Sequence, residues 1–154
     1  MFFENLRLDE SNDFLDNNTI EITLTFISNN LNKNEITNLL KTEPTFAWNP
    51  NEIVEIGSSK RMKVAEVGKW YLKSVAQNDN LDLAIESFLQ TFPNDTNIWF
   101  GLTKKYETFI EVTCYHCAWN NTYTISNKTL MLLANRNLSL SFDIYNMDIG
   151  GDNE

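Results

Sequence analysis

A short run near residue 115, Cys114-Tyr115-His116-Cys117, carries both thiols and the single imidazole of the chain. Thiolates and imidazoles are the ligands that zinc prefers, and paired thiols support disulfide and redox chemistry. The run ends an alternating segment, residues 109–117, which predicts a β-strand. Side chains three apart on a strand point to opposite faces, so Cys114 and Cys117 can neither share an ion nor form a disulfide there.

Cys114 and His116 share a face of this expected strand, but two ligands are too few for structural zinc. We therefore expect no metal site, and a core position for Cys114. A bulge or turn at residues 116–117 would reopen the metal interpretation.

No other combination of residues predicts catalysis. The five glycines are scattered, and none follows a strand with the spacing of a phosphate-binding loop. There is no Gly-x-Ser-x-Gly nucleophile motif, and any catalytic triad would depend on His116. Neighbouring carboxylates, Glu52 with Glu55 and Glu107 with Glu111, fit exposed positions as well as an acid–base pair. We expect a non-enzymatic protein without a cofactor, with an enzyme as the weaker alternative.

The charge of the chain is concentrated at its two ends. The 154 residues carry 21 acidic and 12 basic side chains, a formal net charge of −9. Residues 22–142 are electrically balanced, so the excess of acids lies in residues 1–21 and 143–154. A balanced body lacks the positive field that nucleic acid or an anionic membrane requires, and we expect neither as a partner. The ends are either solvated termini or one acidic surface that attracts a basic protein.

The start of the chain has no basic region followed by an apolar run of the kind found in secretory signals. No stretch approaches the roughly 20 apolar residues of a membrane-spanning helix. We therefore expect a cytoplasmic protein.

Alternating segments predict the strands. Residues 19–28 place apolar side chains on one face and Glu21, Thr23 and Thr25 on the other, which is typical of a half-buried strand. Residues 68–74 and the closing segment 138–145 alternate in the same way. Two hairpins are expected, one from 53–56 and 61–67 and one from 98–104 and 108–117.

Three segments predict helices, because their apolar residues recur at helical spacing after a residue suited to an N-cap. The helices are expected to follow Asn32 or Asn34, Asp79 or Asn80, and Ser126. The first ends before Pro44 and the second extends to Phe92. The third runs to Asn135, with Leu130, Leu133 and Ala134 inward.

The order of these elements predicts the fold class. Runs of adjacent strands argue against a doubly wound parallel sheet. They favour an α+β two-layer sandwich, with a mostly antiparallel sheet of about five to seven strands and three helices on one face. We expect residues 1–18 to form an acidic N-terminal segment, 19–146 a single domain and 147–154 a flexible acidic tail.

Residues 43–68 are the hardest to interpret. They start with a proline-punctuated loop at 43–50, continue into the first hairpin, and overlap the basic stretch of the chain. That stretch contains Lys60, Arg61, Lys63, Lys69 and Lys73. Lysines along a strand edge block pairing with other chains. If it is irregular, a connection of this length within a compact domain is also a common location for function.

Three segments stand in an order that resembles a known bacterial family. They are residues 35–44 (Glu-Ile-Thr-Asn-Leu-Leu-Lys-Thr-Glu-Pro), 68–74 (Gly-Lys-Trp-Tyr-Leu-Lys-Ser) and 138–145 (Leu-Ser-Leu-Ser-Phe-Asp-Ile-Tyr). Together they resemble the domain of unknown function 4279 family over about residues 20–146. Members often have a Lys-Gly pair in the loop before the tryptophan strand, where this chain has Glu55-Ile56-Gly57-Ser58. The resemblance implies a small cytoplasmic α+β domain without an established activity, and it supplies no catalytic residues.

The composition and the absent chemistry favour a protein-binding domain, and more narrowly an immunity protein that neutralises a bacterial toxin. Many toxins act on nucleic acid through basic sites, which an acidic inhibitor can occupy. The alternative is a small-molecule-binding regulatory domain, in which the 43–68 loop and Trp48 line a pocket. The residues expected to bind a partner are Asp9, Glu10, Asp13, Asp16, Trp48, Glu52, Glu55 and Arg61.

Overall fold

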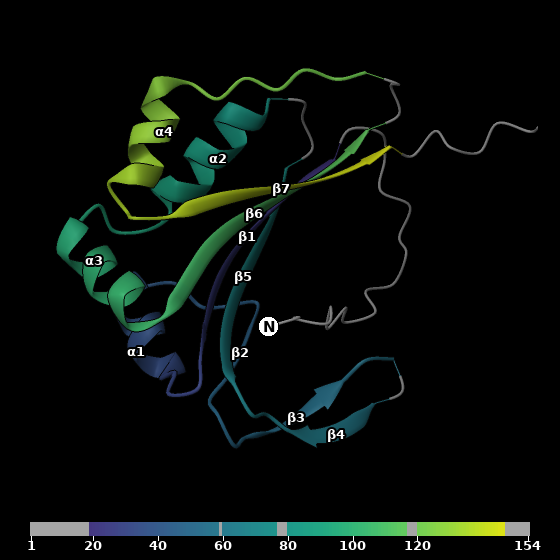
Figure 1. Ribbon diagram of the computed structural model, residues 1–154, viewed down its shortest axis with the longest axis vertical. Coiled ribbons are helices and arrows are strands. Elements are labelled where there is room, and N and C mark those ends of the chain that lie inside the picture. Colours follow the sequence, from purple (N-terminus) through teal and green to yellow (C-terminus); the bar gives the residue numbers. More distant parts are fainter. Residues whose placement is uncertain (1–18, 59, 77–79, 117–119, 147–154) are drawn as a thin grey trace, which may run out of the picture.

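The main element of the fold is a mixed five-stranded sheet. The computed structural model describes residues 19–58, 60–76, 80–116 and 120–146 (Figure 1). The described strands are β1 (Thr19–Ser28), β2 (Phe46–Trp48), β3 (Ile53–Ile56), β4 (Arg61–Val64), β5 (Gly68–Ala76), β6 (Glu107–His116) and β7 (Ser139–Asn146). Five form one sheet in the order β2-β5-β1-β6-β7, and β3 and β4 form a second, two-stranded sheet. Among the described strands only β6 and β7 pair in parallel, so the prediction of a mostly antiparallel sheet is confirmed.

A layer of helices covers one face of the large sheet. The described helices are α1 (Lys33–Leu40), α2 (Leu81–Gln90), α3 (Thr96–Lys105) and α4 (Asn127–Ala134). The strands bow, and the helices lie on the convex side (Figure 1). The core between the layers contains Leu24 and Phe26 of β1, Trp70 of β5 and Ile110 of β6, all fully buried. The α+β two-layer architecture is confirmed, with four described helices where three were expected.

Helix α3 occupies a segment, residues 98–104, that the sequence predicted as a strand. The helix begins after Asp95, whose side chain caps its first turn. Trp99 and Leu102 are three residues apart and both are buried on the core side. The β-branched and aromatic residues at 98–100 favour a strand locally, but the cap and the buried face select the helix. The predicted hairpin of 98–104 with 108–117 is therefore wrong, although its second half forms β6.

Strand β2 forms inside the segment 43–50 that the sequence indicated as a loop. It pairs in antiparallel register with residues 69–71 of β5 and so becomes an edge of the large sheet. Three residues are too few for an alternating pattern to be recognised. Pro44 and Pro50 flank the strand and limit its length.

The hairpin expected within residues 53–67 is confirmed as β3 and β4. Gly57 and Lys60 in its turn have φ values of 69° and 51°, and the Lys60 amide donates to the Gly57 carbonyl at 3.1 Å. Both residues are in the left-handed region, which glycine adopts without strain. The hairpin projects beyond the end of the sheet where β2 lies, away from the helices (Figure 1).

Helix α4 connects β6 to β7 and allows them to pair in parallel, since parallel neighbours need a crossover. Ser126 caps this helix as predicted, by accepting from the Thr129 amide at 3.3 Å. Thr129 and Leu133 are its buried residues, whereas Leu130 and Ala134 are exposed. The predicted inward stripe is wrong at those two positions, because the Thr129 hydroxyl has a partner in Ser126 and can be buried.

Candidate partner-binding surface

The concave face of the large sheet, opposite the helices, carries polar and aromatic side chains. On β1 these are Glu21, Thr23 and Thr25, which alternate with the core residues as the sequence predicted. Thr23 and Thr25 are buried. Thr25 lies in register between Tyr71 of β5 and Phe109 of β6, so small side chains on the central strand are flanked by larger ones.

Three aromatic rings and a lysine, here called the aromatic cluster, lie on this face at the β2 edge. The ring of Phe46 stacks on Trp48, with centroids 5.4 Å apart, and on Tyr71, with centroids 4.4 Å apart. Nζ of Lys69 lies 5.5 Å from the Phe46 centroid and 5.0 Å from the Tyr71 centroid. Burial lowers the pKa of Lys69, and the charge of Glu111 partly opposes this shift. A cation held against aromatic faces in this way is attracted by their quadrupoles.

Two further contacts order the surroundings of the cluster. The indole Nε1 of Trp48 donates to the Val67 carbonyl at 2.9 Å, which fixes the plane of the outermost ring. Beyond Tyr71, Lys73 of β5 and Glu21 of β1 form an ion pair of 3.0 Å whose side chains are mostly buried. Charge on this part of the face is thus paired within the fold.

The β3–β4 hairpin exposes an apolar face to solvent. Its register places Ile53 opposite Val64, and Glu55 opposite Met62, so the four side chains share one side of the ribbon. Ile53 and Met62 are each 66% exposed and Val64 is 53% exposed. We call Ile53, Met62 and Val64 the hairpin face. Arg61 lies next to Met62 and therefore on the other side of the ribbon.

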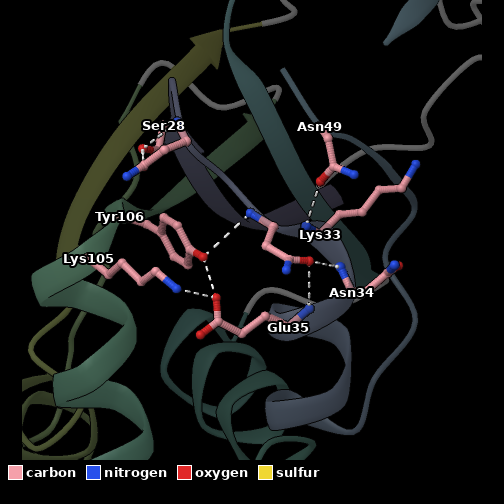
Figure 2. A network of polar contacts seen from close by, with 9 residues as sticks. Ser28, Lys33, Asn34, Glu35, Asn49, Lys105 and Tyr106 are labelled. Atoms are coloured by element: carbon pink, nitrogen blue, oxygen red, sulfur yellow. Dashed lines mark hydrogen bonds and ion pairs between the residues drawn. The ribbon is translucent and has the colours of Figure 1, made fainter. Parts of the chain in front are cut away.

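The hydrogen bond between Lys33 and Asn49, drawn in Figure 2, and the contacts of Glu52 attach the base of the hairpin to α1. The Lys33 amide donates to Asn49 Oδ1 at 2.9 Å, and Lys33 Nζ forms an ion pair with Glu52 Oε2 at 2.7 Å. Asn49 Nδ2 donates to the other oxygen of Glu52 at 3.0 Å. The hydrogen bond from Lys33 is the main reason why the pKa of Glu52 lies below its ordinary value. Glu52 therefore joins the hairpin to the body of the domain.

The hairpin also meets the body by close packing at Gly68, the first residue of β5. A Cβ atom there would lie 2.7 Å from the Cβ of Leu31 and 2.8 Å from the Cδ of Pro50. Only glycine allows these two residues to approach the strand so closely. The chain that leaves the hairpin is thus held between the loop before α1 and the loop before β3.

A second polar network ties α1 to the junction of α3 and β6 (Figure 2). The side chain of Asn32 caps α1 by accepting from the amides of Asn34 and Glu35. Glu35 Oε2 accepts from Tyr106 Oη and pairs with Lys105 Nζ, both at 2.5 Å. The hydrogen bond from Lys105, followed by that from Tyr106, lowers the pKa of Glu35. The pKa of Tyr106 is raised, first by burial and then by its hydrogen bond to Glu35. A carboxylate with these partners acts as a tether rather than as a free base.

A shallow cavity of about 340 Å³ lies between α1 and α3. Its lining consists of Glu35, Leu39, Asn97, Ile98, Gly101 and Leu102. Trp48 is not part of this lining, so the cavity lies on the helix side and not where the pocket of the regulatory alternative was expected.

The described thiol and imidazole of the thiol–imidazole run, those of Cys114 and His116, are both buried. Cys114 is fully buried, which confirms its expected core position, and burial raises the pKa of its thiol. A raised pKa disfavours the thiolate, which is the nucleophile and the metal ligand. His116 is also buried, and Cys117 lies outside the described residues. In residues 19–58, 60–76, 80–116 and 120–146, no three His, Cys, Asp or Glu side chains group so as to hold a metal ion.

Half of the residues predicted to bind a partner can be placed. Trp48 belongs to the aromatic cluster, and Glu52 is at the base of the hairpin with both oxygens engaged. Glu55 and Arg61 are exposed on opposite sides of the hairpin. Asp9, Glu10, Asp13 and Asp16 lie outside the described residues, as do residues 147–154.

Sequence reasoning missed the apolar side of this surface. Ile53, Met62 and Val64 were assigned to strands, but no residue of the hairpin face was expected to bind. The signal was available: folding residues 53–56 onto 61–64 brings the three side chains to one side without an element to cover them. Tyr71 and Phe46 could not have been found in this way, because β2 itself was not predicted.

No described helix is long and apolar enough to cross a membrane. Neither a curated protein nor a solved structure matches the chain. A family model, described as a domain of unknown function, DUF4279, matches residues 18–147. That match covers the five-stranded sheet, the hairpin and all the described helices. The chain therefore belongs to the DUF4279 family, as its three ordered segments suggested.

Proposed function

We propose that this domain is a non-enzymatic binding protein whose partner is another protein. The observation that carries the proposal is the hairpin face, where Ile53, Met62 and Val64 are more than half exposed on a ribbon anchored at its base. Large exposed apolar side chains that gather on one patch are characteristic of protein interfaces. The body of the domain also exposes large apolar side chains, such as Phe100 and Met131, but the register of the hairpin gathers three of them on one side of a short ribbon.

The surroundings of the hairpin face support an interface with a polar rim. Glu55 shares the face, and Arg61 and Lys63 lie on the reverse of the same ribbon. The aromatic cluster adds rings that are already stacked in place, which lowers the entropy lost on binding. Tryptophan, tyrosine and arginine are the residues that most often dominate binding energy.

The more specific proposal is an immunity protein that works in the cytoplasm and neutralises a toxin. Its support is the distribution of charge, because residues 22–142 are balanced and the net charge of −9 lies at the ends. Acidic chain ends together with an apolar docking face suit an inhibitor of a basic enzyme, since charge speeds encounter and the apolar contact then slows dissociation. The engagement of Glu35 and Glu52 in internal ion pairs agrees with a role without catalysis.

Binding is tested with the product of the neighbouring gene and the double variant Ile53→Asp/Met62→Asp. We expect the affinity to fall by at least about 30-fold, because losing a hot-spot contact costs about 2 kcal/mol or more. The matched control is Leu83→Asp/Phe100→Asp, which places the same charges at apolar residues that are 52% and 63% exposed on α2 and α3. Equal loss in both variants would contradict a specific hairpin face.

The immunity role is tested separately by growth. Cells that express the neighbouring gene product should survive only when the wild-type domain is co-expressed, and the hairpin variant should fail to rescue them. Tight binding without rescue would reject the immunity role and retain the binding protein. Neither binding nor rescue would reject both.

A small-molecule-binding regulatory domain is the second candidate, and the shallow cavity of about 340 Å³ between α1 and α3 is the place at which to test it. A metabolite that binds there should raise the melting temperature of the wild-type protein by mass action. Gly101→Leu should abolish that shift, because residue 101 lines the cavity and a Cβ atom added there meets nothing within 4 Å.

A further inference from the structure

The β3–β4 hairpin has two sides of different chemistry. One side is the hairpin face, which Glu55 shares. The other side carries Arg61 and Lys63, and Lys60 lies in the turn that leads into β4. Strand β4 is exposed at each of its four positions, and the hairpin projects beyond the end of the large sheet (Figure 1). A partner can therefore contact this ribbon from both sides at once.

The hairpin is also a positively charged region of an acidic chain. Residues 53–64 contain three basic residues and one acidic residue, a net charge of +2, whereas the whole chain carries −9. The ion pairs among the described residues join Lys33 to Glu52, Lys73 to Glu21, Lys105 to Glu35 and Lys128 to Glu86. Lys60, Arg61 and Lys63 are exposed and pair with no described carboxylate. Their charge is available to carboxylates of another molecule.

We propose that the partner of the hairpin is a protein with a cleft whose two walls differ, one apolar and one acidic. The apolar wall covers the hairpin face, and carboxylates of the opposite wall pair with Arg61 and Lys63. This inference rests on the binding function proposed for the hairpin, and it adds the shape and the charge of the partner's site. Because both sides of β4 become covered, the ribbon enters the cleft instead of lying flat on a surface.

The charge of the whole chain favours a protein over a nucleic acid or an anionic membrane. Both of those present a dense negative field, which repels a chain with a net charge of −9. A cleft in a protein instead places a few carboxylates close to apolar side chains, which matches the two sides of the ribbon. The acidic ends of the chain take no part in this contact. An inhibited basic enzyme would thus hold the hairpin in a cleft beside its basic site.

Charge reversal tests the acidic wall. With the product of the neighbouring gene, Arg61→Glu/Lys63→Glu should lower the affinity by at least about 10-fold at about 50 mM salt, since attraction is replaced by repulsion. The loss should be smaller at about 500 mM salt, because ions screen the charges. The matched control is Lys41→Glu/Lys104→Glu, which makes the same change of charge at two exposed lysines of the body and should bind like the wild type.

The apolar variant Ile53→Asp/Met62→Asp separates this inference from the binding function itself. Loss of binding in that variant, with wild-type affinity in Arg61→Glu/Lys63→Glu, would overturn the acidic wall and retain the binding function. Arg61 and Lys63 would then serve only to guard the strand edge. Wild-type affinity in both variants would reject both proposals.

Thiol accessibility tests whether the ribbon enters a cleft. In a Cys117→Ser background the remaining thiol, that of Cys114, is fully buried. Met62→Cys and Lys63→Cys then place a thiol on one side of the ribbon or on the other. With a saturating amount of the neighbouring gene product, alkylation should be lost at both positions, whereas Phe100→Cys on α3 should react as in the unbound domain. Protection of Met62→Cys alone would show a flat docking surface and overturn the cleft.

Two other kinds of occupant are outcomes of the same variants. Vesicles of phosphatidylcholine and phosphatidylserine, or a DNA duplex, that bind the wild type but not Arg61→Glu/Lys63→Glu would assign the hairpin to a polyanion and overturn the inference. Sedimentation of the domain alone gives the other outcome. Dimers of the wild type that are lost in Arg61→Glu/Lys63→Glu would assign the hairpin to a second copy and overturn the inference as well.

Discussion

The five-stranded body and the β3–β4 hairpin use apolar residues in opposite ways. In the body, Trp70, Trp99 and Leu24 are fully buried between sheet and helices. In the hairpin, Ile53 and Met62 are each 66% exposed. The same residue types therefore stabilise the fold in one region and lie in solvent in the other. The proposed binding function assigns the exposed apolar residues of the hairpin to a partner.

The free energy of unfolding should differ most between the two regions when a large apolar side chain is replaced by alanine. Trp70→Ala should lower the free energy of unfolding by about 3–5 kcal/mol, because it leaves a cavity in the core. Met62→Ala should change it by no more than about 0.5 kcal/mol, because the side chain is exposed. Urea unfolding followed by circular dichroism measures both. A loss of 2 kcal/mol or more in Met62→Ala would mean that the hairpin face is covered within the folded chain, and the comparison would not hold.

The second largest loss of stability is expected at Gly68, where the hairpin meets the five-stranded body. Gly68→Ala should destabilise the protein by about 1–3 kcal/mol, since the new methyl group would overlap Leu31 and Pro50. Thermal unfolding measures the change. Hydrogen exchange should also show faster opening of residues 53–64 than in the wild type, because the hairpin loses its close contact with the loop before α1. Unchanged exchange in the hairpin would show that Gly68 does not hold the two regions together.

A glycine-to-alanine substitution within the helical layer should stabilise the protein instead of destabilising it. Gly101→Ala should stabilise the protein by about 0.5–1 kcal/mol, because Gly101 lies inside α3 and a Cβ atom there meets nothing within 4 Å. The urea midpoint should rise with an unchanged m-value. A lower midpoint would show that the surface of α3 is more crowded than its open surroundings indicate.

The smallest expected effect is the pH dependence of the stabilisation that Glu52 and Glu35 provide. The folded pKa values of Glu52 and Glu35 lie below their ordinary ones, so the unfolded chain binds their protons more readily than the native protein. Their stabilisation is complete above the unfolded pKa of about 4.3 and is lost as the pH falls through the folded pKa. Lys33→Met should flatten the stability profile below about pH 4.5, measured as the urea midpoint against pH. A profile parallel to the wild type would remove Lys33 as the cause.

Most of the body could be predicted from the sequence because its elements carry their own signals. The alternation of β1 and the caps at Asn32, Asn80 and Ser126 identify elements from neighbouring residues alone. Helix α3 could not be identified in this way, because residues 98–100 favour a strand until Trp99 is buried against the sheet. β2 depends on pairing with β5, and the parallel direction of β7 depends on the crossover through α4. These features are set by tertiary contacts that a local pattern does not contain.

In the candidate site, too, features with a local sequence signal could be predicted and features that depend on tertiary contacts could not. The hairpin could be predicted, since its turn residues are a local signal, whereas Trp48 lies in β2, which was not predicted. The structural role of Glu52 could not, because its partners Lys33 and Asn49 come from different elements. The stacking of Phe46 on Tyr71 likewise joins residues that only the sheet brings together.

The position of β1 has a consequence for the synthesis of the protein. It is the first described strand, yet it lies in the middle of the sheet, between β5 and β6. Its partner residues include Tyr115, so its second edge is satisfied only after nearly the whole domain has left the ribosome. At translation rates of about 5–20 residues per second, the edge of β1 that pairs with β6 stays open for on the order of 5–20 s, whereas the edge that pairs with β5 can close earlier. During that interval the nascent chain depends on chaperones, or on its own β5, to avoid pairing with other chains.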